Sequence, residues 1–116
     1  NVLAVDYARL HEILPRSAAV VHAGGIGTCA EALRAGIPSL IIPFSFDQPD
    51  NASRMKRLGV ADILSRRAMQ VTPIAKKLER ILNDVSFSHR ARHHAAQINP
   101  AQTMSAVIEK MESLQA

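Results

Sequence analysis

The sequence contains a single cysteine, Cys29, among its 116 residues. An internal disulfide is therefore excluded, and so is a structural zinc site built from cysteines. There is no tryptophan, and aromatic residues make up only 3% of the chain, which argues against a surface that stacks the bases of RNA or single-stranded DNA. No apolar run approaches the roughly 18 residues of a membrane-spanning helix, so no membrane span is expected.

The N-terminal segment 1–6 has no basic region followed by a long apolar stretch, so it does not form a signal peptide. A cytoplasmic location is expected. The chain also lacks an initiator methionine, which suggests a fragment or a processed product. The net charge is +4, from 14 Lys and Arg against 10 Asp and Glu. This charge suits anionic ligands such as nucleotides but is too small to predict nucleic-acid binding.

Short apolar runs alternate with helical patterns, which is typical of a parallel sheet covered by helices. The predicted fold class is therefore α/β. The runs that predict strands are residues 2–5, 18–22, 39–42 and 60–64. The run at 39–42 is continuously apolar and rich in β-branched residues, which indicates a buried central strand.

Helical patterns lie between these runs and fill the C-terminal part. The predicted helices are a short turn at 10–14, then 28–35, 50–58, 72–85 and 88–98, and a last helix that Asn99-Pro100 caps. The helix at 72–85 has one apolar stripe, formed by Ile74, Leu78, Ile81, Leu82 and Val85. Gly36 and Gly59 are predicted to end two of them, and Thr72 is predicted to be an N-cap. The last helix has an apolar stripe that must pack on something, formed by Met104, Val107, Ile108, Met111 and Leu114.

Three glycines stand in the segment 21–31, between a predicted strand and a predicted helix. Parallel sheets bind ligands at the carboxyl edge of their strands. Glycines let the backbone approach an anion closely, and the helix N-terminus adds N–H donors and positive potential. The segment therefore predicts a diphosphate-binding loop at Gly24, Gly25, Gly27 and Thr28, where Thr28 adds a hydroxyl donor.

The glycine spacing matches neither G-x-G-x-x-G nor G-x-x-x-x-G-K-[ST], which disfavours dinucleotide oxidoreductases and P-loop NTPases. The sequence also has no Asp-x-Asp pair that could hold a metal on a sugar nucleotide. Neither a metal nor a cofactor is predicted. Backbone amides and the helix dipole would then stabilise a diphosphate leaving group.

Several motifs follow one another with characteristic spacing. They are His22-Ala23-Gly24-Gly25-Ile26-Gly27-Thr28, Glu31-Ala32-Leu33, Gly36-Ile37-Pro38, Pro43, Asp47-Gln48-Pro49-Asp50-Asn51-Ala52 and Leu58-Gly59-Val60-Ala61. Together they resemble the donor-binding signature of UDP-glucuronosyltransferase-like glycosyltransferases, in particular the bacterial branch of rhamnosyltransferases and antibiotic glycosyltransferases. The resemblance covers about residues 2–61.

The resemblance implies the GT-B fold, in which two Rossmann-like domains enclose the active site. Residues 1–116 would then be the C-terminal, nucleotide-sugar (donor) binding domain, a Rossmann-like parallel sheet with flanking helices that is incomplete at its N-terminal side. The acceptor domain would be absent. The general base would lie in that absent domain, so no residue of this chain is predicted to be catalytic, and the chain alone is expected to be inactive.

The resemblance also assigns roles to single residues. Gly24, Gly25, Gly27 and Thr28 would bind the donor diphosphate. His22 either joins them as a phosphate contact or is a strand-end residue with a packed ring.

Two further roles have structural alternatives. Glu31 would accept hydrogen bonds from the ribose hydroxyls, but Thr28-x-x-Glu31 is equally a capping box. Asp47 and Gln48 would hold the donor sugar, because a carboxylate and an amide together match the donors and acceptors of a diol. Their alternative is an Asx turn that caps the next helix. Asn51 is predicted to be structural.

The predicted function is transfer of a hexosyl group from a UDP- or dTDP-sugar to a hydroxyl acceptor. The partners would be that donor, an unidentified acceptor and the chain's own N-terminal domain, with no nucleic acid. Two alternatives remain. One is the related peptidoglycan N-acetylglucosaminyltransferase type, which the spacing from Asp47 to Asn51 disfavours. The other is a non-catalytic nucleotide-binding or interaction module that docks through the C-terminal apolar stripe.

Overall fold

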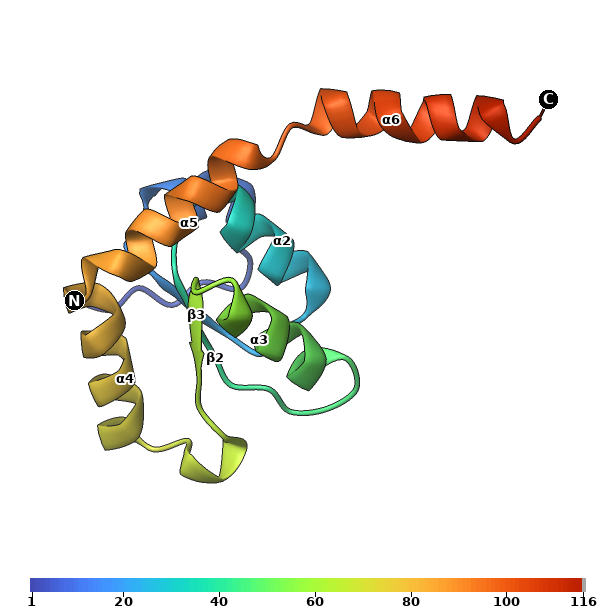
Figure 1. Cartoon of the computed structure of the whole chain (residues 1–116). Coiled ribbons are helices and arrows are strands. Elements are labelled where there is room, and N and C mark those ends of the chain that lie inside the picture. The colour runs from blue at the N-terminus through green and yellow to red at the C-terminus, as the bar shows by residue number, and fades with distance from the viewer. Residues whose placement is uncertain (116) are drawn as a thin grey trace.

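Strands and helices alternate along the first half of the chain, and helices alone follow (Figure 1). The computed structural model describes residues 1–115. Within them the strands are β1 (Val20–His22), β2 (Ser39–Ile41) and β3 (Ala61–Ile63). The helices are α1 (Leu10–Ile13), α2 (Ile26–Ala35), α3 (Gln48–Arg57), α4 (Val71–Asn83), α5 (Val85–Gln97) and α6 (Pro100–Ser113), with 3-10 turns η1 (Leu14–Arg16) and η2 (Arg66–Ala68). The predicted α/β class is confirmed.

The strands of the described residues form one parallel sheet in the order β1–β2–β3. The central strand β2 is buried along its whole length, as its continuous apolar sequence predicts. The register pairs His22 with Ile41 and Ile41 with Ile63. The carboxyl ends of all three strands therefore lie level at one edge of the sheet, where ligands bind to parallel sheets.

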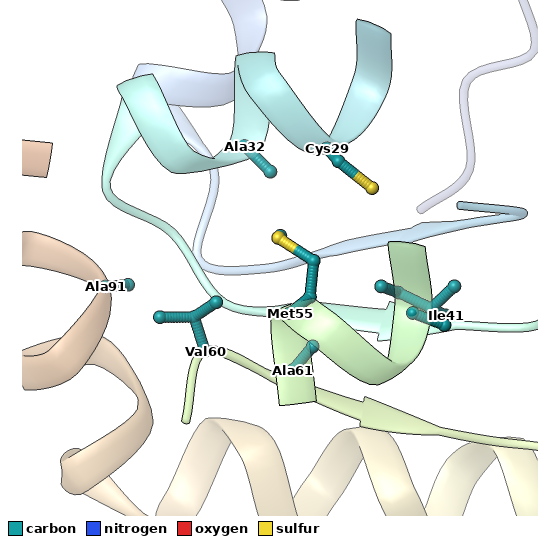
Figure 2. Packing of buried hydrophobic residues seen from close by; sticks show 8 residues of the cluster. Cys29, Ala32, Ile41, Met55, Val60, Ala61 and Ala91 are labelled. Atoms are coloured by element: carbon teal, nitrogen blue, oxygen red, sulfur yellow. The ribbon is translucent and has the colours of Figure 1, made fainter. Parts of the chain in front are cut away.

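Helices cover both faces of the sheet. Alternate side chains of β2 point to opposite faces, and the apolar side chains Leu40 and Ile41 are buried in different clusters. On one face Ile41 lies in a cluster with side chains of α2, α3 and α5, and Figure 2 shows Cys29 of α2 across from Met55 of α3. On the other face Leu40 packs with Ile81 of α4. These two apolar layers hold the helices in place around the sheet.

The glycines predicted to end two helices do so. Gly36 follows α2 with φ of +71°, and Gly59 comes just after α3 with φ of +77°. Both lie in the left-handed region that L-residues with side chains rarely adopt.

The predicted strand at residues 2–5 is wrong. These residues lie in no strand, and Val2 and Leu3 are 98% and 86% exposed. Within the described residues β1 is an edge strand that pairs with β2 alone. The open side of β1 is not paired with the run at 2–5, and an apolar run whose backbone pairs with no other strand does not form one.

Two predicted helices begin two residues early, α2 at Ile26 and α3 at Gln48. The predicted N-cap Thr72 is also wrong, since α4 already begins at Val71 and Gln70 is its N-cap. Pro73 then lies within the first turn of α4, where the missing N–H removes no intrahelical bond.

The helix predicted to run to Val85 ends at Asn83. The Asp84 side chain accepts a hydrogen bond from the Ser86 N–H at 3.0 Å and caps α5. Val85 is consequently the first residue of α5 and is 65% exposed, outside the apolar stripe of α4. An Asp followed by a helical pattern is a cap signal, and it separates the two helices here.

The last helix, α6, projects away from the rest of the chain (Figure 1). Its predicted Asn99 cap is confirmed, because the Asn99 side chain accepts from the Gln102 N–H at 3.1 Å. The apolar stripe of α6 is exposed, with Met104 at 60% and Leu114 at 75%. None of the helices within residues 1–115 combines the length and the apolar composition needed to cross a membrane.

Candidate functional site

The glycine loop connects the carboxyl end of β1 to the start of α2, as predicted. Gly25 is the N-cap of α2, and no side chain caps this helix end. The first N–H groups of an α-helix have no intrahelical acceptor. Those of Ile26, Gly27 and Thr28 therefore remain available, with the positive end of the helix dipole, to an anion at the edge of the sheet.

Gly24 is the residue of this loop that only glycine can fill. Its φ is +94°, and a Cβ on Gly24 would lie 3.0 Å from Ile41 Cγ2 and 3.2 Å from the Gln48 carbonyl oxygen. Gly25 differs, because a Cβ there would meet nothing within 4 Å. The loop thus combines one position fixed by packing with others that have open space beside the backbone.

Both ring nitrogens of His22 are used inside the chain. The Gly24 N–H donates to Nδ1 at 3.0 Å, and Nε2 lies 3.1 Å from Ser39 Oγ. Since Nδ1 accepts, the neutral ring has its hydrogen on Nε2 and donates it to Ser39. Burial lowers the pKa of His22 and so favours this neutral form. A direct phosphate contact from His22 would have to replace one of these two bonds.

Glu31 lies in the second turn of α2, where it pairs with Arg34. Arg34 Nη2 is 2.6 Å from both carboxylate oxygens of Glu31. The capping-box alternative is wrong, because Gly25 is the N-cap and Thr28 already lies inside the helix. The Glu31 side chain keeps 30% of its surface exposed, so a ligand hydroxyl can still reach the carboxylate.

Asp47 and Gln48 stand at the start of α3, in the loop that follows β2. Asp47 is the N-cap by position, but its side chain caps no backbone N–H. The Asx-turn alternative is therefore not found. Gln48 turns back instead, and its Oε1 accepts from the N–H groups of Phe44 at 2.9 Å and Ser45 at 3.2 Å. Its Nε2 donor is left for another partner.

The loop between β2 and α3 has two unusual features. Phe46 has φ of +58° although it is not glycine, and its side chain is 96% exposed. Non-glycine residues rarely adopt this conformation, and such residues cluster at functional sites. Two residues earlier in the loop, the centre of the Phe44 ring lies 5.0 Å from the Arg66 guanidinium of η2, a cation–π contact between the loop and η2.

Asn51 connects the two loops, which the sequence motifs did not reveal. Its Nδ2 donates to the Gly24 carbonyl oxygen and to Asp47 Oδ2, both at 3.0 Å. The structure thus brings Gly24, His22, Asp47 and Asn51 into one hydrogen-bonded group, whereas Glu31 lies apart with Arg34. The spacing of four between Asp47 and Asn51 on a helix is the signal that could have indicated half of this group.

The charge of Asp47 reaches the first turn of α2. Burial, and after it the negative charge of Asp47, raises the pKa of the Cys29 thiol. A protonated, buried thiol is a poor nucleophile, so Cys29 acts as a core residue. Within residues 1–115 no three His, Cys, Asp or Glu side chains gather as a metal site would require.

Chemically, the edge offers two kinds of contact side by side. The start of α2 presents backbone donors suited to an anion, and the start of α3 presents a carboxylate and an amide donor suited to hydroxyl groups. A ligand with an anionic group next to a polyol fits this arrangement.

Comparison with known proteins gives consistent results. The family described as "Erythromycin biosynthesis protein CIII-like, C-terminal domain" matches residues 1–114. The aklavinone 7-beta-L-rhodosaminyltransferase of Streptomyces galilaeus is 34% identical over the whole chain, and human UDP-glucuronosyltransferase 2B28 is 38% identical over 64% of it. The chain spans 26% and 14% of the lengths of these two relatives.

A solved structure has the same fold. The glycosyltransferase VinC, in complex with dTDP, superimposes with a TM-score of 0.85 and 30% sequence identity. The match covers 97% of this chain and 30% of the VinC chain. The similarity therefore extends over the whole sheet and its helices.

Proposed function

The chain belongs to the family of erythromycin biosynthesis protein CIII-like C-terminal domains and has the fold of the C-terminal domain of a GT-B glycosyltransferase, and from this we propose that it binds the donor of a hexosyl transfer. The donor is a nucleotide-diphospho-sugar, a dTDP- or UDP-sugar. The complete protein transfers the sugar to a hydroxyl group of an acceptor. Bacterial antibiotic glycosyltransferases and UDP-glucuronosyltransferases are among the relatives of the chain.

The observation that carries this proposal is the uncapped start of α2 at the carboxyl edge of the sheet. Gly25 caps the helix without a side chain, so the backbone N–H groups that follow can bind a diphosphate. VinC, which has the same fold over 97% of this chain, is in complex with dTDP. A nucleoside diphosphate is the part of the donor that this helix end suits.

In this proposal Gly24, Gly25, Gly27 and Thr28 form a diphosphate-binding loop, and Asp47 and Gln48 bind hydroxyls of the sugar. Glu31 binds the ribose hydroxyls in exchange for, or together with, its contact to Arg34. His22 supports the loop through the Gly24 N–H. Backbone amides and the helix dipole stabilise the leaving diphosphate, and no metal ion is required.

The acceptor and the general base come from outside this chain. The chain spans 26% of the length of the rhodosaminyltransferase relative, and an acceptor domain facing the edge of the sheet would occupy part of the remainder. Positioning two reactants against each other contributes about 7–11 kcal/mol to lowering a barrier. We therefore expect the 116-residue chain to bind the donor and to transfer no sugar.

A transfer assay on the complete protein tests the proposal. Panels of dTDP- and UDP-sugars are combined with hydroxyl-bearing acceptors, including aklavinone, and release of the nucleoside diphosphate is followed with and without EDTA. The expected result is acceptor-dependent release that survives EDTA. Release from no donor in the panel, or release only with an added divalent ion, contradicts the proposal. The alternative of a non-catalytic module has no support among the relatives.

A further inference from the structure

Gly24 is held at both of its backbone polar groups by side chains from other elements. Its N–H donates to His22 Nδ1 at the end of β1, and its carbonyl oxygen accepts from Asn51 Nδ2 of α3, each at 3.0 Å. The residue is buried and has φ of +94°. The conformation that begins the diphosphate-binding loop is therefore fixed from two sides.

The amide of Asn51 has two hydrogens, and each has its own acceptor. One is donated to the Gly24 carbonyl oxygen, 27 residues earlier in the chain, and the other to Asp47 Oδ2, one helical turn earlier. Asn51 is only 9% exposed. Since a buried amide that lost a partner would leave an unsatisfied polar group, both bonds are costly to break.

We propose that Asn51 is a positioning residue that sets the distance and orientation between the diphosphate-binding loop and the sugar-binding carboxylate of Asp47. This inference rests on the proposed donor site. The diphosphate and the sugar of a donor are joined covalently, so the groups that bind them must keep a fixed separation. Those groups follow different strands, β1 and β2, and the Asn51 amide is the side chain that joins the two loops directly.

The chemistry of the contact requires an amide. Both partners of Asn51 Nδ2 are oxygen acceptors, one of them a carboxylate. An Asp at position 51 would place a second carboxylate against Asp47 and would repel the Gly24 carbonyl oxygen. With Asp47 Oδ2 held by Asn51, the other carboxylate oxygen can accept from a sugar hydroxyl.

A double-mutant cycle on the complete protein tests the coupling, with dTDP and dTDP-glucose as probes. Alone, Asp47→Ala should lower the affinity for dTDP-glucose about tenfold and leave that for dTDP nearly unchanged. Asn51→Ala should lower both affinities. In the Asn51→Ala background the additional effect of Asp47→Ala should shrink to less than about threefold, because Asp47 is no longer held. The control Asn83→Ala, an exposed residue at the end of α4, should change neither affinity.

The outcomes separate the inference from the function on which it rests. If the wild-type protein binds none of dTDP, dTDP-glucose, UDP and UDP-glucose, the proposed donor site itself is wrong; if it binds only the UDP pair, the same cycle is carried out with that pair. If it binds both members of a pair, and Asp47→Ala has the same effect with and without Asn51, then the donor site stands and the positioning role of Asn51 is overturned.

A second measurement needs no change at Asn51, should Asn51→Ala fail to fold. The Gly24 carbonyl shares its peptide with the Gly25 N–H, so the amide resonance of Gly25 reports on the bond from Asn51. Asp47→Ala should shift that resonance in the unliganded protein, and the matched change Asp50→Ala should not, because Asp50 pairs with Arg54 at the surface. No shift with Asp47→Ala, or equal shifts in both variants, overturns the inference.

Discussion

The Arg34 guanidinium nitrogen Nη2 lies 2.6 Å from both carboxylate oxygens of Glu31. The two residues are neighbours on the surface of α2, three positions apart. The Arg34 side chain is 54% exposed and that of Glu31 30% exposed. Exposed pairs of this kind contribute at most about 1 kcal/mol, so a ribose can displace or share the Arg34 contact.

We predict that Glu31→Ala lowers the affinity for UDP about tenfold more than the affinity for 2′-deoxy-UDP, since the lost contact is to the ribose hydroxyls. The thermal midpoint should change little, because Glu31 is not part of a helix cap. Arg34→Ala is the control, as it removes the ion pair and keeps the carboxylate, and it should not lower UDP affinity. If Glu31→Ala lowered the affinity for both nucleotides equally, Glu31 would not be a ribose-binding residue.

Alanine substitutions at Gly24 and Gly25 should have different effects on the stability of the fold and on dTDP binding. Gly24→Ala forces a side chain into a φ of +94° with Ile41 Cγ2 at 3.0 Å, and should lower the free energy of unfolding by about 1–3 kcal/mol. Gly25→Ala has open space and an ordinary φ of −59°, so it should cost less than about 1 kcal/mol. Its added methyl group should nevertheless lower the affinity for dTDP, because the diphosphate must approach the backbone at this position.

Urea unfolding and dTDP titration of both variants check this prediction. A Gly25→Ala variant that is as stable as the wild type and binds dTDP with unchanged affinity would count against a ligand at this loop.

Gln48 has two functions that different substitutions can separate. Gln48→Glu keeps an oxygen acceptor for the Phe44 and Ser45 N–H groups but removes the Nε2 donor, whereas Gln48→Ala removes both. If Nε2 binds the donor sugar, both variants should reduce the ratio of dTDP-glucose affinity to dTDP affinity, by about tenfold. If Gln48 only holds the loop, only Gln48→Ala should change this ratio. Gln97→Glu on α5 is the matched control.

Asp62 stabilises the fold away from the site. Its side chain is only 4% exposed and lies 3.1 Å from Lys77 Nζ, 3.4 Å from Arg80 Nη1 and 3.8 Å from Lys56 Nζ. Burial alone would raise the pKa of Asp62, but the hydrogen bond from the Ile63 N–H and the contacts of Lys77 outweigh it and hold the pKa below its usual value. One carboxylate thus connects β3 to α3 and α4.

We predict that Asp62→Asn lowers the free energy of unfolding at neutral pH by about 1.5–3 kcal/mol. Because the folded state depresses the pKa of Asp62, the stabilisation is complete above the ordinary carboxyl pKa and is lost as the pH falls through the folded value. The difference between wild type and variant should therefore shrink in acid. Urea unfolding at stepwise lower pH measures it, with the exposed Asp50→Asn as control. A difference that is constant with pH would contradict the prediction.

The central part of the fold was predictable from local sequence. The continuous apolar run at 39–42 identified the buried strand, and Gly36 and Gly59 marked helix ends because φ above zero is a local property. The strand predicted at residues 2–5 failed because a strand needs a neighbour, which no local pattern reveals. The sequence pattern does not reveal the cap at Asp84, because one apolar stripe continues through it to Val85.

The candidate site was predictable as a set of loops but not as a set of contacts. The glycines indicate the loop before α2, and Asp47 and Gln48 indicate the loop before α3, although both helices begin two residues earlier than predicted. The bond from Asn51 to Gly24 joins residues 27 positions apart, and its existence depends on how α3 packs against the loop after β1. The pairing of Glu31 with Arg34, by contrast, was available from their spacing of three on a helix.

Amide chemical shifts during titration of the 15N-labelled chain with dTDP test most directly whether the start of α2 binds the donor diphosphate. Saturable shifts should be largest at the N–H groups of Gly25, Ile26, Gly27 and Thr28, with a dissociation constant on the order of millimolar for a partial site. Gly25→Ala should reduce them. Saturable shifts centred elsewhere, such as around Gly36 at the opposite edge of the sheet, or no saturable shift either with dTDP or with UDP titrated in its place, would contradict a donor site at this loop.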